Sequence, residues 1–120
     1  MVIRQGDVYW LHLFGIGSEP AGRRPAIVVQ ADHFNRSAIN TAVVAAITSN
    51  VRLGEMPGNV RLRKGEAGLP QPSVVNVSQL RTVDRSRLAE RIGGVSDERL
   101  AQILRGLALV LGIEMQDDAP

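Results

Sequence analysis

The sequence predicts a small α+β domain, in which a series of short strands precedes one long helix. Short apolar runs divided by Gly- and Pro-rich turns fill the first three-quarters of the chain, which is typical of strands. From Ser96 onwards the apolar residues recur at helical spacing instead. Strands followed by a helix favour the α+β class. Without an internal repeat or a linker, the 120 residues indicate one domain over residues 1–120.

The first strand is predicted in "GDVYWLHL", where Val8 and Trp10 alternate with Tyr9 and Leu11. We expect Trp10 to lie in the core. A Gly- and Pro-rich connection, "FGIGSEPAGRR", follows. The continuous apolar run "PAIVVQA" predicts a buried strand that starts at Pro25, because a missing backbone donor costs least at the start of a strand.

The middle of the chain predicts a short helical turn and further strands. The turn is expected in "DHFNRSAI", with Asp32 as its cap, and Gln30, Asp32 and Asn35 are interpreted as residues that fix the turn. The run "TAVVAAIT" predicts another buried strand. Further short strands are predicted in "NVRLR", "SVVNVS", "LRTVDRSRL" and "AERIGGV", which "MPG", "KGEAGLPQP" and polar turns separate.

The predicted helix starts after Ser96, whose hydroxyl can cap it, while Asp97 and Glu98 favour its positive end. Gly106 either weakens this helix by about 1 kcal/mol relative to alanine or permits close packing. Residues from about 114 to 120, "EMQDDAP", are predicted to form a flexible acidic tail. The apolar stripe that we expect against the sheet consists of Leu100, Ile103, Leu104, Leu107 and Leu111.

The composition argues against several classes of protein. Hydrophobic residues make up 44% of the chain, as in ordinary globular proteins, and no cysteine is present for disulfides or zinc. The sequence has no apolar window that could span a membrane and no signal-peptide core, so we expect a cytoplasmic protein without membrane contact. It also lacks a P-loop, a dinucleotide-binding fingerprint and a nucleophile elbow. Two histidines argue against a His-ligated metal or a two-histidine ribonuclease site, and we expect no cofactor.

The positive charge of the chain resides almost entirely in arginine. The net charge is +2, and Lys64 is the one lysine among 14 basic residues. Without Glu114, Asp117 and Asp118 near the C-terminus, 14 basic residues face 9 acidic ones. This bias reflects either the base composition of the genome or a need for planar, bidentate contacts to phosphate or carboxylate.

Arginine and hydroxyl side chains suit an enzyme that cleaves RNA, because the ribose 2′-OH already provides the nucleophile. Such an enzyme must orient this hydroxyl and stabilise charge on the phosphate oxygens. Pro25 holds the preceding Arg24 in an extended conformation next to a buried strand, which gives a rigid mount. Thr48 stands where the run "TAVVAAI" stops, which by itself favours simple strand termination. Arginine is a poor general base, so proton transfer is not explained by these residues.

Several segments together resemble one known family, the MazF/PemK toxins, which are the RNA-cleaving halves of bacterial toxin–antitoxin pairs. The resemblance covers roughly residues 2–113. No single motif is specific, but their order and spacing agree with the family. The segments are "GDVYW", "GSEPAGRRPAIVVQAD", "AAITSN", "PGNV", "SVVNVSQLRTVDRSRL" and "GLALVLGI".

The resemblance implies an SH3-like, strongly bent antiparallel β-barrel with a C-terminal α-helix, which acts as a homodimer. It implies a metal-independent endoribonuclease that cleaves single-stranded RNA (mRNA, or tRNA or rRNA) at short sequences. The products would be a 2′,3′-cyclic phosphate and a 5′-hydroxyl, and translation and growth would stop. A cognate, MazE-like antitoxin with a disordered acidic segment would dock near the dimer interface and block the RNA site.

The resemblance also implies the catalytic residues. The arginine directly before the proline of the R-P pair is Arg24, and the threonine that ends "AAIT" is Thr48; both motifs are intact. Arg23 is an additional charge at this position, which either assists in binding phosphate or is solvated. Because the chain has few aromatic residues to stack on bases, we expect hydrogen bonds and phosphate contacts to dominate RNA binding, which salt should weaken.

Other RNA-binding candidates follow from the same family positions. Gln79 in "SQLRT" matches a position that can contact bases, and its amide is both donor and acceptor; a turn-facing polar residue is the alternative. Ser73 is a similar candidate, as is Glu19 in "GSEPAG", the loop with which the family covers its substrate. Arg81 begins a basic stretch that forms either a solubilising face or a surface for RNA or antitoxin. The other arginines of this stretch are Arg85, Arg87 and Arg91.

Two other functions are compatible with the same fold. One is a non-enzymatic toxin that poisons a protein target such as DNA gyrase, and the other is a plain RNA-binding barrel. The intact R-P and "AIT" motifs favour the ribonuclease over both.

Overall fold

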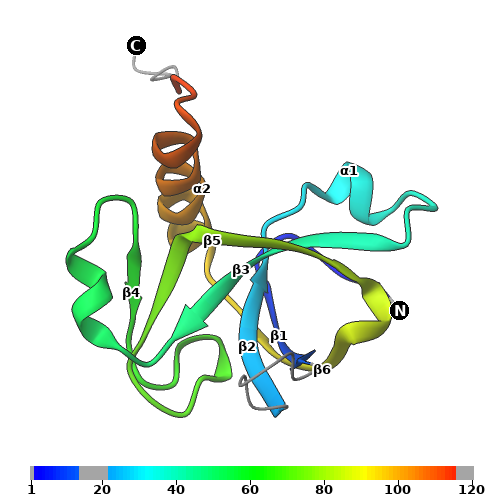
Figure 1. Ribbon diagram of the computed structural model, residues 1–120, viewed down its shortest axis with the longest axis horizontal. Coiled ribbons are helices and arrows are strands. Elements are labelled where there is room, and N and C mark those ends of the chain that lie inside the picture. The colour runs from blue at the N-terminus through cyan, green and yellow to red at the C-terminus, as the bar shows by residue number, and fades with distance from the viewer. Residues whose placement is uncertain (1, 14–21, 116–120) are drawn as a thin grey trace.

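Six antiparallel strands form one curled sheet in the part of the chain that the computed structural model describes, residues 2–13 and 22–115. The strands are β1 (Asp7–Leu13), β2 (Gly22–Val28), β3 (Thr41–Thr48), β4 (Val60–Leu62), β5 (Ser73–Asp84) and β6 (Leu88–Gly94). Their order in the sheet is β4-β5-β3-β2-β1-β6. A C-terminal helix, α2 (Asp97–Leu111), contacts β5 and β4 and extends beyond the sheet (Figure 1). The α+β class and the strongly bent antiparallel sheet with a C-terminal helix are therefore confirmed.

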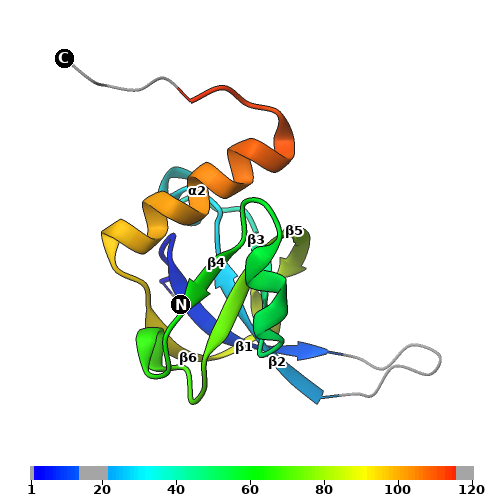
Figure 2. The same cartoon turned by 90° about the vertical axis from the view of Figure 1, so that its left-hand side faces the viewer.

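Short helical segments connect the strands. Figure 2 shows that the β1–β2 pair extends beyond the rest of the sheet, on the side away from α2. The connecting segments are α1 (Asp32–Asn35) and the 3-10 turns η1 (Val51–Glu55), η2 (Glu66–Gly68) and η3 (Arg85–Arg87).

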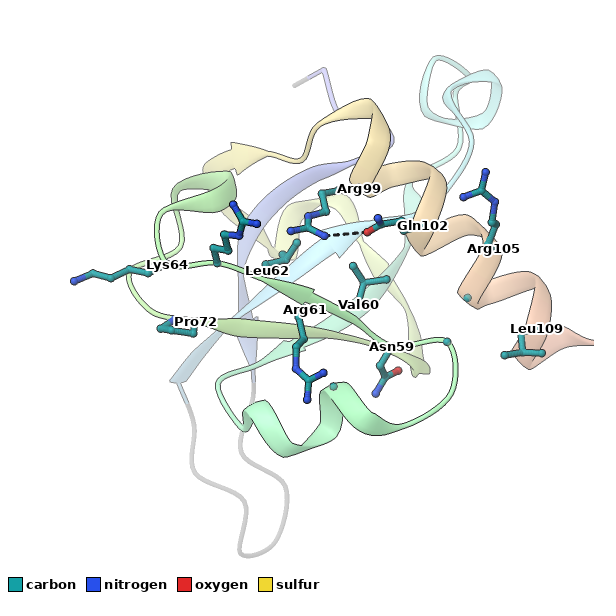
Figure 3. Close-up of a pocket in the computed structure, with 14 residues that line it drawn as sticks. Asn59, Val60, Arg61, Leu62, Lys64, Pro72, Arg99, Gln102, Arg105 and Leu109 are labelled. Atoms are coloured by element: carbon teal, nitrogen blue, oxygen red, sulfur yellow. Dashed lines mark hydrogen bonds between the residues drawn. The ribbon is translucent and has the colours of Figure 1, made fainter.

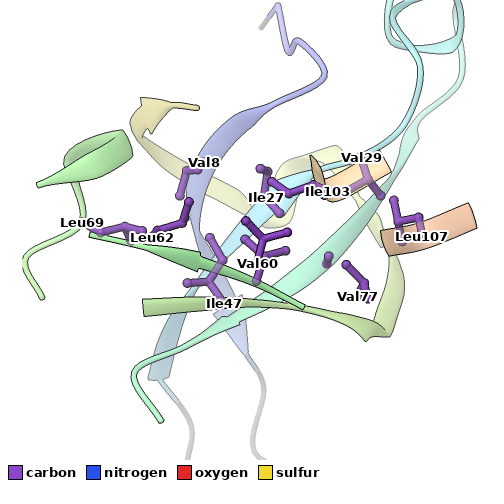
Figure 4. Packing of buried hydrophobic residues seen from close by; sticks show 12 residues of the cluster. Val8, Ile27, Val29, Ile47, Val60, Leu62, Leu69, Val77, Ile103 and Leu107 are labelled. Atoms are coloured by element: carbon purple, nitrogen blue, oxygen red, sulfur yellow. The ribbon is translucent and has the colours of Figure 1, made fainter. Parts of the chain in front are cut away.

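The curled sheet buries side chains on both of its faces. Val8 of β1 belongs to a cluster that also contains Ile103 and Leu107 of α2 (Figure 4). Tyr9 and Leu11, whose side chains point to the opposite face of β1, belong to a second buried cluster. Burial of each such side chain contributes about 1.5–3 kcal/mol. The alternating side chains of β1 therefore contribute to two buried clusters, one on each face of the strand, and not to one buried and one solvated face.

Strand β2 starts earlier than the sequence predicts. It begins at Gly22, so Arg23 and Arg24 belong to the strand and Pro25 lies inside it. Pairing with β3 begins only at Ala26, and at Pro25 the strand is paired with β1 alone. A proline is tolerated there because one side of the strand needs no ladder donor.

The turn after β2 is fixed by a buried polar network, as predicted, but Asp32 is not its cap. Helix α1 begins at Asp32 itself, after Ala31. The Asp32 carboxylate instead accepts a hydrogen bond from the Gln5 backbone N–H at 2.7 Å, and this bond lowers the pKa of Asp32. Asn35 donates to the Gln30 carbonyl at 2.9 Å, and the Gln30 amide donates to the Asn35 side-chain oxygen at 2.9 Å. Gln30, Asp32 and Asn35 therefore act as scaffolding.

The sequence predicted two separate strands in "SVVNVS" and "LRTVDRSRL", but the structure has one long strand there, β5. It is one strand of 12 residues with a break in register: Ala45 of β3 pairs with Leu80, whereas Ala46 pairs with Asn76. Residues 77–79 therefore bulge out of the ladder, and such a bulge bends a strand. The segment "RSR" forms η3 rather than strand, and β6 begins at Leu88.

Helix α2 starts as predicted but ends outside the core. The Ser96 hydroxyl accepts a hydrogen bond from the Arg99 backbone N–H at 3.1 Å, which confirms the cap. Leu111 was expected in the buried stripe, yet its side chain is 59% exposed, because the last turn of the helix passes beyond the sheet. Gly106 serves close packing, since a Cβ there would lie 2.0 Å from the Gly58 carbonyl oxygen. No helix in the described ranges is long and apolar enough to cross a membrane.

Candidate active site

Most of the site residues predicted from the sequence line one groove. Its volume is about 750 Å³, and β1, β2, β3, β5 and the segment before β5 form its walls. Among the residues that line it are Arg23, Arg24, Thr48, Ser73, Gln79 and Arg81. Of the predicted site residues only Glu19 is missing from this set, because it lies outside the residues that the structure describes.

Arg24 and Thr48 line the same groove from the neighbouring strands β2 and β3. The ladder between these strands ends at the pair of Ala26 and Ala46. Arg24 and Thr48 each lie two residues beyond this pair, and because side chains alternate along a strand, each side chain points to the same side of its strand as the paired alanine. Arg24 is exposed, and its guanidinium makes no hydrogen bond or ion pair with any residue in the described ranges. It is therefore available to an anion.

The hydroxyl of Thr48 is oriented by the turn that follows it. Thr48 is the last residue of β3, and its Oγ1 accepts a hydrogen bond from the Asn50 backbone N–H at 3.1 Å. The hydroxyl proton remains free to donate to a ligand oxygen. Asn50 in turn accepts from the Arg52 backbone N–H at the start of η1. The turn thus fixes the position of the donor.

Arg23 and Trp10 form a pair at the edge of the groove. The guanidinium carbon of Arg23 lies 4.4 Å from the centre of a Trp10 ring. Arg23 also approaches Glu90 at 4.0 Å, at the outer limit for an ion pair. Trp10 was expected in the core, but it is half-buried and lines the groove. No pattern in the sequence indicated this, because the alternation of β1 is equally compatible with burial.

Gln79, Arg81 and Ser73 reach the groove from β5. Gln79 lies in the bulge of residues 77–79, and within the described part of the chain neither Gln79 nor Arg81 has a side-chain hydrogen bond. Both can therefore bind a ligand. Ser73 is different, because it is 4% exposed and its hydroxyl donates to the Gln71 carbonyl at 2.9 Å. Its oxygen can only accept while this bond is kept.

The basic stretch after Gln79 does not form one continuous face. Arg81 lies in the groove, whereas Arg85 donates to the carbonyls of α1, including that of Asn35 at 2.7 Å. Arg91 donates to the carboxylate of Asp7 at 3.1 Å. These two arginines hold neighbouring elements together, which the sequence pattern did not predict.

The groove is strongly cationic. Arg23, Arg24 and Arg81 are the charged side chains among its described lining residues, which include no carboxylate and no histidine. Such a lining suits an anion with several oxygens, because each guanidinium can donate two parallel hydrogen bonds. In the described ranges there is also no group of three or more His, Cys, Asp or Glu that could hold a metal ion.

Comparisons with known proteins show to which family the chain is related. A family model described as the PemK-like, MazF-like toxin of type II toxin–antitoxin systems matches residues 4–111. The Endoribonuclease MazF2 of Mycobacterium bovis is 42% identical over 94% of this chain and all of its own. The Endoribonuclease EndoA of Bacillus subtilis is 35% identical over 94% of this chain and 97% of its own.

A solved structure shares the fold. It is a MazE–MazF complex from Deinococcus radiodurans, with a TM-score of 0.77 and 28% identity over 95% of this chain and 99% of that one. The family match extends over all of the described strands and over α2. The chain therefore belongs to the PemK-like, MazF-like toxins of type II toxin–antitoxin systems.

Proposed function

We propose that this chain cleaves single-stranded RNA at a short recognition sequence, without a metal ion, as an endoribonuclease of its toxin family. Two curated relatives are named endoribonucleases, and this chain matches each of them over nearly its whole length. The observation that carries the proposal is that Arg24 and Thr48 both line one groove, in which the charged lining residues among those described are all arginines.

In this proposal Arg24 and Thr48 bind the scissile phosphate. The free guanidinium of Arg24 donates two N–H bonds to non-bridging phosphate oxygens. The Thr48 hydroxyl, held by the Asn50 backbone N–H, donates its own proton to another oxygen. Donors fixed in this way stabilise charge that grows on the phosphate during the reaction. Both are mounted on strands, so the geometry is rigid.

The cleavage step is a transesterification. The ribose 2′ oxygen forms a bond to phosphorus while the bond from phosphorus to the 5′ oxygen breaks. The 2′ hydroxyl loses a proton and the 5′ oxygen gains one, which leaves a 2′,3′-cyclic phosphate and a 5′-hydroxyl. Orientation of the 2′ oxygen in line with the leaving oxygen is the contribution of the groove walls. The described lining residues thus supply positioning and charge rather than a base.

Sequence recognition is assigned to residues of β5 in this proposal. The amide of Gln79, exposed in the bulge, can both donate to and accept from a base edge. Arg81 and Arg23 bind flanking phosphates, and the oxygen of Ser73 accepts from a base or a ribose hydroxyl. Glu19, in the connection between β1 and β2 and outside the described residues, is also proposed to contact the substrate.

The proposed partners are those of the family. The chain acts as a homodimer, and a cognate antitoxin with an acidic segment blocks the cationic groove, in keeping with the solved MazE–MazF complex of a relative. Cleavage of mRNA, tRNA or rRNA in the cytoplasm then stops translation and growth until the antitoxin rebinds.

The test is cleavage of a long RNA of mixed sequence in the presence of EDTA, with all cut ends mapped. We expect cuts at one short sequence, with 5′ ends that a kinase can label directly. Arg24→Ala and Thr48→Val should each lower kcat/KM by about 10²–10³-fold, as loss of one donor to a developing oxyanion does. Arg36→Ala, which removes an exposed arginine outside the groove, is the matched control.

Two outcomes would overturn the proposal. A folded Arg24→Ala variant that cuts at the wild-type rate would remove Arg24 from the site. A wild-type chain that leaves every RNA intact but inhibits DNA gyrase would be a non-enzymatic toxin instead. A substrate with a single 2′-deoxyribose at the cut site must resist cleavage, because the nucleophile is then missing.

A further inference from the structure

A second cavity, of about 850 Å³, lies between η1, β4 and α2, and the proposed cleavage site does not use it (Figure 3). We refer to it as the β4–α2 cleft. Its uncharged lining includes Val60, Leu62, Pro72 and Leu109, while none of its described lining residues is a carboxylate. Its charged lining residues are Arg61, Arg63, Lys64, Arg99 and Arg105.

Four of these five cations form no side-chain hydrogen bond or ion pair within the described ranges, although Arg63, after Arg99, also helps to lower the pKa of the nearby Glu66. The guanidinium of Arg99 is bound to the carboxylate of Glu66, with N–O distances of 2.9 and 3.0 Å. The side chains of the other four make no hydrogen bond or ion pair with any described residue. The uncompensated positive charge of the cleft therefore exceeds that of the cleavage groove, where Arg23 is close to Glu90.

Arg61 and Arg63 are both exposed, on either side of the buried Leu62. Arg61 is the exposed residue of β4, between the buried Val60 and Leu62, and Arg63 directly follows the strand. β4 is an edge strand of the described sheet, so one of its backbone edges has no partner strand there. The Arg61 side chain rests against the backbone of η1, where a Cβ on Gly54 would lie 2.5 Å from its Nε. Glycine at this position makes room for the arginine.

The cleft and the cleavage groove share a wall. Gln71 and Ser73 line the groove, and Pro72 between them lines the cleft. A flexible strand that leaves the groove past this segment therefore reaches the cleft next. RNA is such a strand, and it carries one negative charge per nucleotide, so its path needs cations beyond the cut itself.

We propose that the β4–α2 cleft is an accessory RNA-binding site, which holds backbone phosphates of nucleotides outside the recognition sequence. This rests on the proposed ribonuclease function and deepens it. The shared wall favours RNA over an acidic polypeptide, because it makes the cleft a continuation of the substrate path. Contacts to phosphate carry no sequence information, so the cleft raises affinity for long RNA and leaves the cut sequence unchanged.

The test compares two substrates with the same cut sequence, one of about 7 and one of about 30 nucleotides. The cleavage kinetics of each substrate are measured at several salt concentrations. In the double variant Arg61→Gln, Arg63→Gln, we expect kcat/KM for the long RNA to fall about 10-fold and that for the short RNA to change less than about two-fold. The slope of log KM against log salt for the long RNA should become shallower by about 1.4, since each phosphate contact contributes about 0.7.

A matched double variant, Arg4→Gln with Arg36→Gln, removes the same charge from exposed positions outside the cleft and should keep wild-type behaviour. Because the cleft variant could also alter folding or assembly, wild-type protein provides a second readout. A long RNA that carries a photoreactive thiouridine several nucleotides from the cut should crosslink to the peptide containing residues 59–64.

Equal losses on both substrates, or crosslinks elsewhere only, would overturn the accessory site. A cleft variant that keeps wild-type kinetics on long RNA but loses binding to a polyglutamate peptide would assign the cleft to a protein partner. If the wild-type chain cleaves no RNA, the proposed function fails separately. Binding of long RNA, measured by fluorescence anisotropy, then still shows whether the cleft holds RNA.

Discussion

Replacing Gly106 with alanine should destabilise the protein, although alanine is the stronger helix former. In the interior of a helix, alanine is favoured over glycine by about 1 kcal/mol. Here the new Cβ would lie 2.0 Å from the carbonyl oxygen of Gly58 and 2.9 Å from its carbonyl carbon. Relief of this clash requires a shift of α2 by roughly 1 Å, which loosens the contacts of Ile103 and Leu107. Overpacking costs about 1–3 kcal/mol, and a clash of this severity with backbone atoms falls in the upper part of that range, at about 2–3 kcal/mol. After the gain of about 1 kcal/mol in helix propensity, we expect a net loss of about 1–2 kcal/mol.

Thermal and urea unfolding of the Gly106→Ala variant measure this loss. A change of this size corresponds to a decrease in Tm of about 4–10 °C for a domain of this length. Gly112→Ala is the matched control, because a Cβ at Gly112 meets no atom within 4 Å and only its φ of +72° is unfavourable. It should cost about 1 kcal/mol for the left-handed backbone alone. A Gly106→Ala protein as stable as the wild type would show that α2 is not seated against Gly58 as described.

Three further predictions concern charges and protons. The hydrogen bonds from Arg99 lower the pKa of Glu66, so this pair should contribute about 1 kcal/mol to the free energy of unfolding at a pH above the unfolded pKa of Glu66. As the pH falls through the folded pKa, the difference in stability between the wild type and Glu66→Gln should vanish. Urea titrations of both proteins at pH 3–7 measure this difference. No described lining residue of the groove is a carboxylate or imidazole, so the 2′-hydroxyl must lose its proton without a side-chain base, and log kcat should rise with pH between about 6 and 8. A flat profile would indicate a carboxylate base instead. Trp10 holds Arg23 by a cation–π contact worth about 0.5–1 kcal/mol. In a double-mutant cycle with the single and double alanine variants, the losses of RNA affinity should therefore be non-additive by about this amount. Strictly additive losses would argue against a role of the contact in RNA binding.

Local patterns in the sequence determined much of the secondary structure. The apolar run of β3, the alternation of β1 and the Ser96 cap of α2 each depend on neighbouring residues alone, so they can be read without the fold. The R-P and "AIT" motifs likewise pointed to Arg24 and Thr48. That both belong to one site was expected only from the resemblance to a family, since neither segment indicates which strands pair.

The tertiary structure decided what depends on register, curvature and long-range contacts. The bulge in β5 places Gln79 in the groove, yet the sequence there reads as the end of one strand and the start of another. Trp10 lines the groove rather than the core, because the curled sheet has no single inner face. Arg91 is engaged by Asp7, a partner far away in the chain. A sequence reports the period and polarity of each segment, whereas the position of a side chain relative to distant segments is set by how the sheet bends and packs.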